Sequence, residues 1–114
     1  MTATRQLRVY IAGPIKGMPN GNREAFAAAA TELKALGFAP VNPWEIPPGD
    51  HPGQQCIGEP VDGAAHHYGC YLRADIVELL ACDAITMLPG WDLSKGASTE
   101  HHVAASIGLR MVVL

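Results

Sequence analysis

The chain has 114 residues, of which 48% are hydrophobic and 17% are charged, and its formal net charge is −3. A chain of this length and composition is expected to form one globular domain over residues 1–114, with a single core. The acidic balance and the absence of a basic stripe disfavour a nucleic-acid polymer as partner and leave a small-molecule ligand open.

The cysteines and the amino-terminal sequence indicate a cellular location. Cys56, Cys70 and Cys82 are odd in number and contain no Cys-x-x-Cys pair, which is typical of reduced thiols inside the cell. The amino-terminal residues lead into a predicted strand without a signal-peptide hydrophobic region, and no uncharged apolar stretch reaches membrane-spanning length. We therefore expect a cytoplasmic protein with no membrane partner.

The first half of the chain predicts a strand, a helix and a second strand. Residues 7–12 form an apolar run that predicts a buried central strand. Residues 22–36 predict a helix capped by Asn22, and residues 38–41 predict a second, parallel strand, which completes a right-handed βαβ unit. The apolar face of the predicted helix consists of Phe26, Ala29, Ala30 and Leu33.

Two loops in this half carry possible ligand contacts. Residues 13–22 are glycine-rich, and free N–H groups in such a loop can receive an anion. The loop has neither a Walker ending nor the Gly-x-Gly-x-x-Gly fingerprint, so an anion site and a simple connecting turn both stay open. Residues 43–63, rich in Pro and Gly, have the length of a functional lid or a disordered segment, and Trp44 either anchors this loop or covers a ligand.

The second half predicts a helix, a strand, a helix and a last strand. Residues 62–82 predict a helix that begins at Asp62, followed by a strand over 84–88, a helix over 96–107 and a strand over 109–114. The fold class is therefore α/β: a small doubly wound domain, flavodoxin-like or Rossmann-like, with a parallel sheet of about four strands and three main helices.

Two carboxylates are expected to face inward on successive helices. The apolar residues after Glu100 recur at i+3, i+4 and i+7, and Asp75 stands at the edge of the middle helix's apolar stripe. Each has an ordinary explanation: Glu100, in the predicted first turn of its helix, favours the positive end of the helix dipole, and Asp75 pairs with Arg73 or with a loop N–H. Together they line the crevice where open parallel sheets bind ligands. The two stripes are Val103, Ala104 and Ile107 after Glu100, and Leu72, Ile76, Leu79 and Leu80 around Asp75.

The sequence does not favour a metal site. Neighbouring residues on a helix point about 100° apart, so the adjacent pairs at 66–67 and 101–102 are poor chelators. His66 and Cys70 stand at i and i+4 as half of a site, but no second half has a matching spacing. A Gly-x-Ser-x-Gly elbow for acyl transfer is also missing.

Three separated segments together resemble the nucleoside deoxyribosyltransferase superfamily. They are residues 10–17 (Tyr-Ile-Ala-Gly-Pro-Ile-Lys-Gly), Asp75, and residues 94–100 (Ser-Lys-Gly-Ala-Ser-Thr-Glu). The likeness covers nearly the whole chain in order. It is greatest to the small deoxynucleoside monophosphate N-glycosidases and to short phage and bacterial relatives, and it implies a flavodoxin-like fold.

The resemblance implies cleavage, by hydrolysis or by transfer, of the N-glycosidic bond of a nucleotide or nucleoside. Glu100 matches the family's nucleophile, which attacks C1′ to form a covalent glycosyl-enzyme, and Tyr10 and Asp75 match the tyrosine and aspartate near that carbon. No metal or organic cofactor is implied, and relatives commonly form homodimers or larger assemblies. The alternative is a non-catalytic nucleotide-binding or sensing module of the same fold.

The resemblance also implies which residues bind the substrate. Ser94 matches the phosphate-binding serine of the monophosphate hydrolases, whereas Asp92 in a base-holding role would favour a transferase. Pro14 and Lys16 stand where the hydrolases commonly have serine and arginine, and lysine keeps the charge but lacks the bidentate fork. The residues expected to bind the substrate are Gly13, Ile15, Lys16, Gly17, Asp92, Ser94, Gly96 and Ala97.

Overall fold

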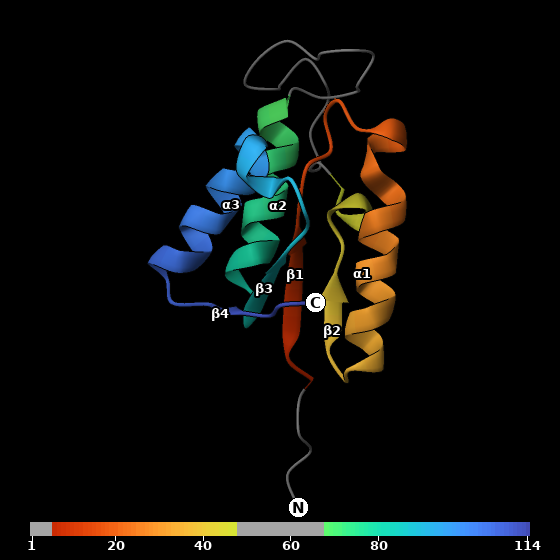
Figure 1. The fold of residues 1–114 in the computed structure, drawn as a ribbon. Helices are drawn as coiled ribbons and strands as arrows, with labels where there is room; N and C mark the ends of the chain where they lie inside the picture. Colours follow the sequence, from red (N-terminus) through yellow and green to blue (C-terminus); the bar gives the residue numbers. More distant parts are fainter. Residues whose placement is uncertain (1–5, 48–67) are drawn as a thin grey trace, which may run out of the picture.

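The computed structural model describes residues 6–47 and 68–114, which form a parallel four-stranded sheet with helices on both faces (Figure 1). The strand order is β2-β1-β3-β4, and every neighbouring pair is parallel. The strands are β1 (Arg8–Ala12), β2 (Ala39–Val41), β3 (Ala84–Met87) and β4 (Arg110–Met111), and the helices are α1 (Arg23–Ala35), α2 (Tyr68–Leu80) and α3 (Lys95–Ser106).

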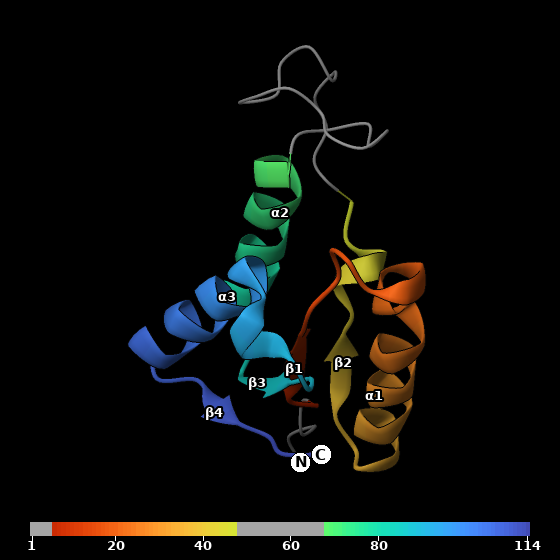
Figure 2. The same ribbon diagram turned by 45° about the horizontal axis from the view of Figure 1, so that its top comes forward.

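The order of the strands decides which face each helix covers. The chain steps from β1 to β2 in one direction and returns across β1 to β3, so right-handed connections place α1 on one face and α2 and α3 on the other (Figures 1 and 2). The direction of winding reverses between β1 and β3, and this switch point is where open α/β sheets bind ligands. The predicted small doubly wound α/β fold is confirmed.

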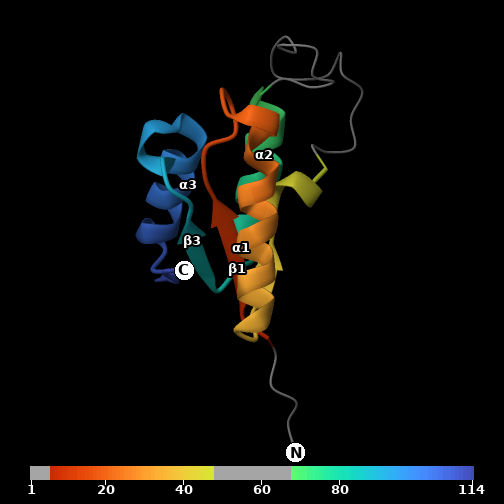
Figure 3. The ribbon, with the colours of Figure 1, turned by 45° about the vertical axis from the view of Figure 1, so that its right-hand side comes forward.

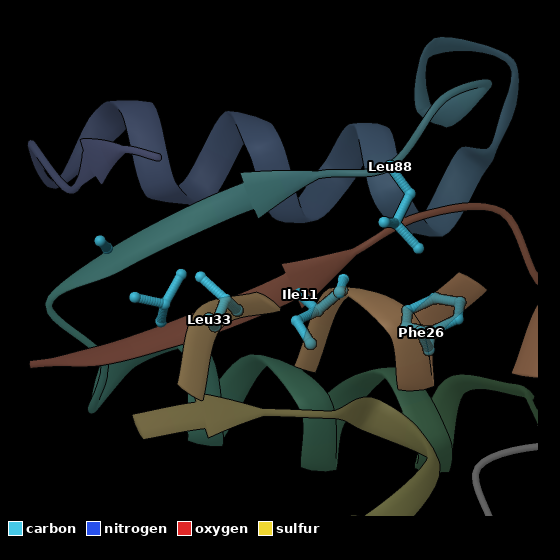
Figure 4. Packing of buried hydrophobic residues seen from close by; sticks show 7 residues of the cluster. Ile11, Phe26, Leu33 and Leu88 are labelled. Atoms are coloured by element: carbon cyan, nitrogen blue, oxygen red, sulfur yellow. The ribbon is translucent and has the colours of Figure 1, made fainter. Parts of the chain in front are cut away.

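Alternate residues of β1 enter two separate cores because successive side chains of a strand point to opposite faces. Val9 and Ile11 pack on the α1 side with Phe26 and Leu33, as Figure 4 illustrates for three of these residues. Tyr10 lies on the opposite side, in the core formed with α2 and α3. The second core consists of Tyr10, Ala12, Leu79, Cys82, Ile85 and Ala104.

Most predicted boundaries agree with the structure to within two residues, and the exceptions have physical causes. The last strand is shorter than predicted because the regular pairing ends at Met111, and Val112 packs into the α1-side core. Ile107 is 49% exposed because α3 ends at Ser106 and its helical periodicity stops there. Leu80 is 54% exposed at the end of α2. The predicted start of that helix, Asp62, lies outside the described residues.

Polar contacts join the carboxyl-terminal end of α2, and the turn that follows it, to the start of β1. The Asp83 carboxylate accepts the backbone N–H of Arg8 at 2.8 Å, and the Arg8 guanidinium reaches the Glu78 carboxylate at 3.0 Å. The half-exposed ion pair contributes little by itself, but the Asp83 bond satisfies a backbone donor at the start of the strand. None of the described helices is long and apolar enough to cross a membrane.

Candidate active site

A buried tyrosine and a buried glutamate meet between the sheet and α3. Tyr10 lies in the middle of β1 and is completely buried, and its hydroxyl donates a hydrogen bond to Oε2 of Glu100. Glu100 is only 5% exposed, on the face of α3 that also buries Ala97 and Ala104. The predicted inward orientation of Glu100 is therefore confirmed.

The position of Glu100 along α3 differs from the predicted first turn. The Ser94 hydroxyl accepts the N–H of Ala97 at 3.2 Å and caps the helix, so α3 begins at Lys95 and Glu100 is its sixth residue. The field of the helix N-terminus falls off within the first turn, so it does little for this carboxylate. Burial raises the pKa of Glu100 to about 7, and the hydrogen bond from Tyr10 opposes that rise.

Asp75 of α2 lies close enough to Glu100 for their charges to interact. Burial, followed by the negative charge of Glu100, raises the pKa of Asp75 to about 8. α2 and α3 pack side by side on the same face of the sheet (Figure 2), and the two residues interact across this interface. Among the described residues no ion pair joins Asp75 to Arg73, so the explanation through Arg73 lacks its contact.

The environments of the two carboxyl groups give them different pKa values. The pKa is about 7 for Glu100 and about 8 for Asp75, so Glu100 is the first of the two to lose its proton as the pH rises. Burial and the charges of Glu100 and Asp75 raise the pKa of Tyr10 far above its usual value, so its hydroxyl remains a donor. A carboxylate beside a protonated carboxyl group is the pairing that lets one group attack or accept a proton while the other donates one.

A second tyrosine, Tyr68, belongs to the same surroundings and was missed from the sequence. Burial, then the charges of Glu100 and Asp75, raise the pKa of Tyr68. A Cβ built on Gly96 would stand 2.6 Å from the Tyr68 hydroxyl oxygen, so the phenol lies against the first turn of α3. The signal in the sequence was the seven-residue spacing from Asp75, which places both side chains on one face of a helix.

The loop after β1 has a mainly structural amino-terminal part. Gly13 is buried, and a Cβ there would stand 2.7 Å from Cβ of Leu88, so glycine permits the close approach of the chain ends leaving β1 and β3. Ile15 packs against the α1-side core, whereas Lys16 and Gly17 are exposed. Within the described part of the chain, no hydrogen bond or ion pair joins these loop residues to the carboxyl pair.

Trp44 fixes the other end of this loop. Its indole N–H donates to the Gly21 carbonyl at 3.2 Å, and the Arg23 guanidinium stacks 4.1 Å from the ring centroid (Figure 3 shows the neighbouring start of α1). Asn22 has a φ of +62° and makes no side-chain cap; instead its amide donates to the Pro14 carbonyl. The predicted capping by the Asn22 side chain is therefore wrong, because the side chain bonds within the loop.

Replacing Gly21 with alanine is expected to lower stability by about 2 kcal/mol, because two costs combine. The φ of Gly21 is +60°, and a Cβ there would stand 2.4 Å from Cζ2 of Trp44, so the indole must leave its place. Thermal denaturation measures the loss of stability, and the fluorescence of Trp44, in a Trp91→Phe background, reports the displacement of the indole. Gly108→Ala is the control, since Gly108 has a φ of +76° and nothing within 4 Å of the added atom. Equal effects of the two variants would contradict a role for Trp44.

The remaining predicted binding residues lie around the start of α3. Asp92 is exposed, Ser94 is half-buried and Gly96 lies under Tyr68. Ala97 is buried and its N–H is already bonded to Ser94. The Ser98 hydroxyl donates to the Trp91 carbonyl at 3.3 Å and so holds the preceding turn against the helix.

The described histidines do not form a metal site. The His101 ring stacks on Trp91 with centroids 4.4 Å apart, which accounts for one member of the 101–102 pair. His66, the proposed partner of Cys70, lies outside the described residues. Among residues 6–47 and 68–114, no group of three or more His, Cys, Asp or Glu side chains is placed to hold a metal ion.

The fold and the site define the class of protein. A parallel sheet of order β2-β1-β3-β4, with acidic and phenolic side chains on the face that α2 and α3 cover, is a small doubly wound α/β domain with a candidate site beside its switch point. The chain belongs to the family described as a domain of unknown function, DUF4406, whose model matches residues 7–113. No curated protein matches the chain.

Proposed function

We propose that the protein cleaves the N-glycosidic bond of a nucleotide or nucleoside, as its resemblance to the nucleoside deoxyribosyltransferase superfamily implies. The observation that carries the proposal is the pairing of the buried Glu100 with the half-buried Asp75, with the Tyr10 hydroxyl bonded to Glu100. Removing carboxyl groups from water lowers the stability of a fold, so two of them close together beside the switch point of the sheet favour a catalytic role over a structural one.

In the first step the C1′–N bond breaks as the sugar develops positive charge. The ionised Glu100 stabilises this oxocarbenium-like state, and its oxygen forms the bond to C1′. Asp75 gives its proton to the departing base, which leaves neutral with the electron pair of the broken bond. The pKa values of about 7 for Glu100 and about 8 for Asp75 support this division of roles.

In the second step the glycosyl ester on Glu100 is resolved. The Asp75 carboxylate accepts a proton from water, or from the N–H of an acceptor base, as that nucleophile bonds to C1′ and the ester oxygen of Glu100 leaves as carboxylate. Two displacements at the same carbon give net retention. Water yields hydrolysis and a base yields transfer, and both return the enzyme to its starting protonation state.

The start of α3 and the exposed part of the first loop supply the substrate contacts in this proposal. Ser94 accepts the N–H of Ala97, and none of the described residues takes up its own proton, which supports a bond to a 5′-phosphate oxygen. Lys16 adds a positive charge, while Asp92 is exposed and suited to hold the base of a nucleoside instead. We also propose that the protein forms a homo-oligomer, in which a neighbouring copy of the chain completes the binding site.

A panel of deoxynucleoside monophosphates, ribonucleoside monophosphates and deoxynucleosides tests the proposal. Each is incubated with the purified protein, and free base is followed by chromatography, with and without a second base as acceptor. Base release from at least one member is the expected result. Thermal stabilisation by a ligand without any release of base would favour the non-catalytic binding module. The absence of both base release and stabilisation would contradict both functions.

Replacing Tyr10 with phenylalanine is expected to move the acidic limb of the kcat/KM profile to higher pH by about one unit. The Tyr10 hydroxyl favours the ionised form of Glu100, and one hydrogen bond to a charged group is worth about this much. Activity at pH 7 should fall about fivefold, because the ionised fraction of Glu100 falls from about one half to about one tenth, and should recover near pH 8.5, where Glu100 ionises without help. A loss of activity that is the same at every pH would contradict this role.

A further inference from the structure

Tyr68 lies where α2 crosses the start of α3, and Gly96 makes room for it. A Cβ built on Gly96 would stand 2.6 Å from the Tyr68 hydroxyl oxygen but 3.7 Å from the ring carbon that carries it. Only the oxygen atom is therefore too close for a side chain at position 96. Tyr68 is 41% exposed, so its side chain is partly open to solvent although its hydroxyl lies against α3.

The spacing along the two helices relates this contact to the carboxyl pair. Tyr68 and Asp75 are seven residues apart on α2, and Gly96 and Glu100 are four residues apart on α3, so each pair shares one face of its helix. Both helices begin at the carboxyl end of the sheet (Figures 1 and 2). The Tyr68–Gly96 contact therefore lies nearer that end, and the carboxyl pair lies further down the same interface.

The electrostatic surroundings of Tyr68 agree with this placement. The negative charges of Glu100 and Asp75 both act on its phenol and, with burial, raise its pKa. The hydroxyl consequently keeps its proton at neutral pH and is a hydrogen-bond donor. A donor beside two acidic groups offers a contact to an oxygen-bearing ligand that the carboxyl groups themselves cannot offer while ionised.

We propose that Tyr68 is a substrate-contacting residue whose hydroxyl donates a hydrogen bond to an oxygen of the sugar-phosphate part of the bound nucleotide, in a position that Gly96 keeps open. The inference rests on the proposed function and adds a contact from α2 to those expected from residues 10–17 and 94–100. The same contact narrows the class of substrate to nucleotides or nucleosides that place an acceptor oxygen at the start of α3.

Two single variants and their combination test the contact through steady-state kinetics. Tyr68→Phe removes only the oxygen and is expected to raise KM about tenfold with little change in kcat, as the loss of one ground-state hydrogen bond does. Gly96→Ala displaces the same oxygen and is expected to raise KM by a similar factor. Its melting temperature should be equal or higher, because alanine favours a helix.

The double variant distinguishes this contact from two independent effects. The ring carbon of residue 68 lies 3.7 Å from the added methyl group, which is an ordinary contact, so alanine fits beside phenylalanine. KM of the double variant is therefore expected to rise about tenfold, as in either single variant, rather than about a hundredfold. Multiplied losses, or a Tyr68→Phe variant with unchanged KM, would overturn the proposal.

A binding measurement separates failure of this proposal from failure of the proposed function. Calorimetry with a deoxynucleoside 5′-monophosphate is carried out on Glu100→Gln and on Glu100→Gln combined with Tyr68→Phe. About tenfold weaker binding to the second protein supports the Tyr68 contact even where the wild type releases no base. Equal binding to the two proteins, or no binding to either, overturns it, whatever the wild-type turnover is.

Discussion

The Glu100→Gln variant is expected to lose turnover by about 10⁴-fold or more and, at pH 8, to melt at a higher temperature than the wild type. Glutamine keeps the acceptor oxygen for the Tyr10 hydroxyl but cannot form the ester to C1′. It also carries no charge, so the cost of burying an ionised carboxylate at 5% exposure disappears. Loss of function and gain of stability in one variant is the signature of a site residue.

The pH dependence of this stability gain follows from the direction of the pKa shift. The folded-state pKa of Glu100 is raised from 4.5 to about 7, so the folded protein holds its proton more tightly than the unfolded chain. The resulting stabilisation is complete below the unfolded pKa and is lost as the pH rises through the folded one. Glu100→Gln should therefore differ little from the wild type at pH 4.5 to 5 and should gain about 1–3 kcal/mol at pH 8, or roughly 5 °C or more.

Chromatography of the released base and differential scanning calorimetry at pH 5 and pH 8 measure the two parts of this result. Glu32→Gln is the control, because Glu32 is exposed on α1, away from the carboxyl pair. It should leave both turnover and the melting temperature within experimental scatter. A Glu100→Gln variant that melts lower than the wild type at both pH values would mean that Glu100 is a structural residue.

Periodicity predicted the parts of the fold and site that depend on which face of an element is buried. The spacing of Phe26, Ala29 and Leu33 placed α1 on the sheet, and all three are buried. The same reasoning placed Glu100 inward, although Ile107 at the end of the same stripe is exposed. Burial of a face is a property of several residues together, so the sequence pattern predicts it well.

Contacts between residues far apart in the chain could not be predicted in the same way. The closeness of Gly13 to Leu88, and of Gly96 to Tyr68, depends on how two elements pack, and a glycine in a sequence does not reveal which neighbour it admits. Asn22 and Ser94 are both good capping residues by type, yet only Ser94 caps its helix. The choice depends on whether the side chain finds a better partner, as Asn22 does at the Pro14 carbonyl.

The difference between the pKa values of the two carboxyl groups also could not be predicted from the sequence alone. From the sequence, Glu100 was expected in the first turn, where the helix N-terminus favours a carboxylate, but the cap at Ser94 places it beyond that turn. The Tyr10 hydroxyl provides the opposing effect instead, and it acts on Glu100 rather than on Asp75. The hydrogen bond from the central strand lowers the pKa of Glu100, and the negative charge of Glu100 raises that of Asp75, so both effects favour ionisation of Glu100 first.

This order of ionisation predicts a narrow bell-shaped pH profile for kcat/KM, with its maximum between about pH 7 and pH 8. The active form has Glu100 ionised and Asp75 protonated, so activity rises as the first group loses its proton and falls as the second does. The apparent pKa values of the two limbs describe Glu100 and Asp75 together, because the charge of each group affects the ionisation of the other. Activity measured from pH 5.5 to pH 9.5 in buffers of constant ionic strength tests the shape.

Asp75→Asn is expected to abolish the alkaline limb, keep the acidic limb near pH 7, and lower kcat/KM by about 10²–10⁴-fold on a nucleotide whose base must be protonated to leave. Asparagine resembles the protonated carboxyl group in shape and charge, so Glu100 keeps its neutral neighbour but the departing base receives no proton. A deoxyriboside with a nitrophenolate leaving group needs no such proton, and on it the variant should lose much less activity. Equal losses on both substrates would assign Asp75 to orienting the sugar, because that role is independent of the leaving group.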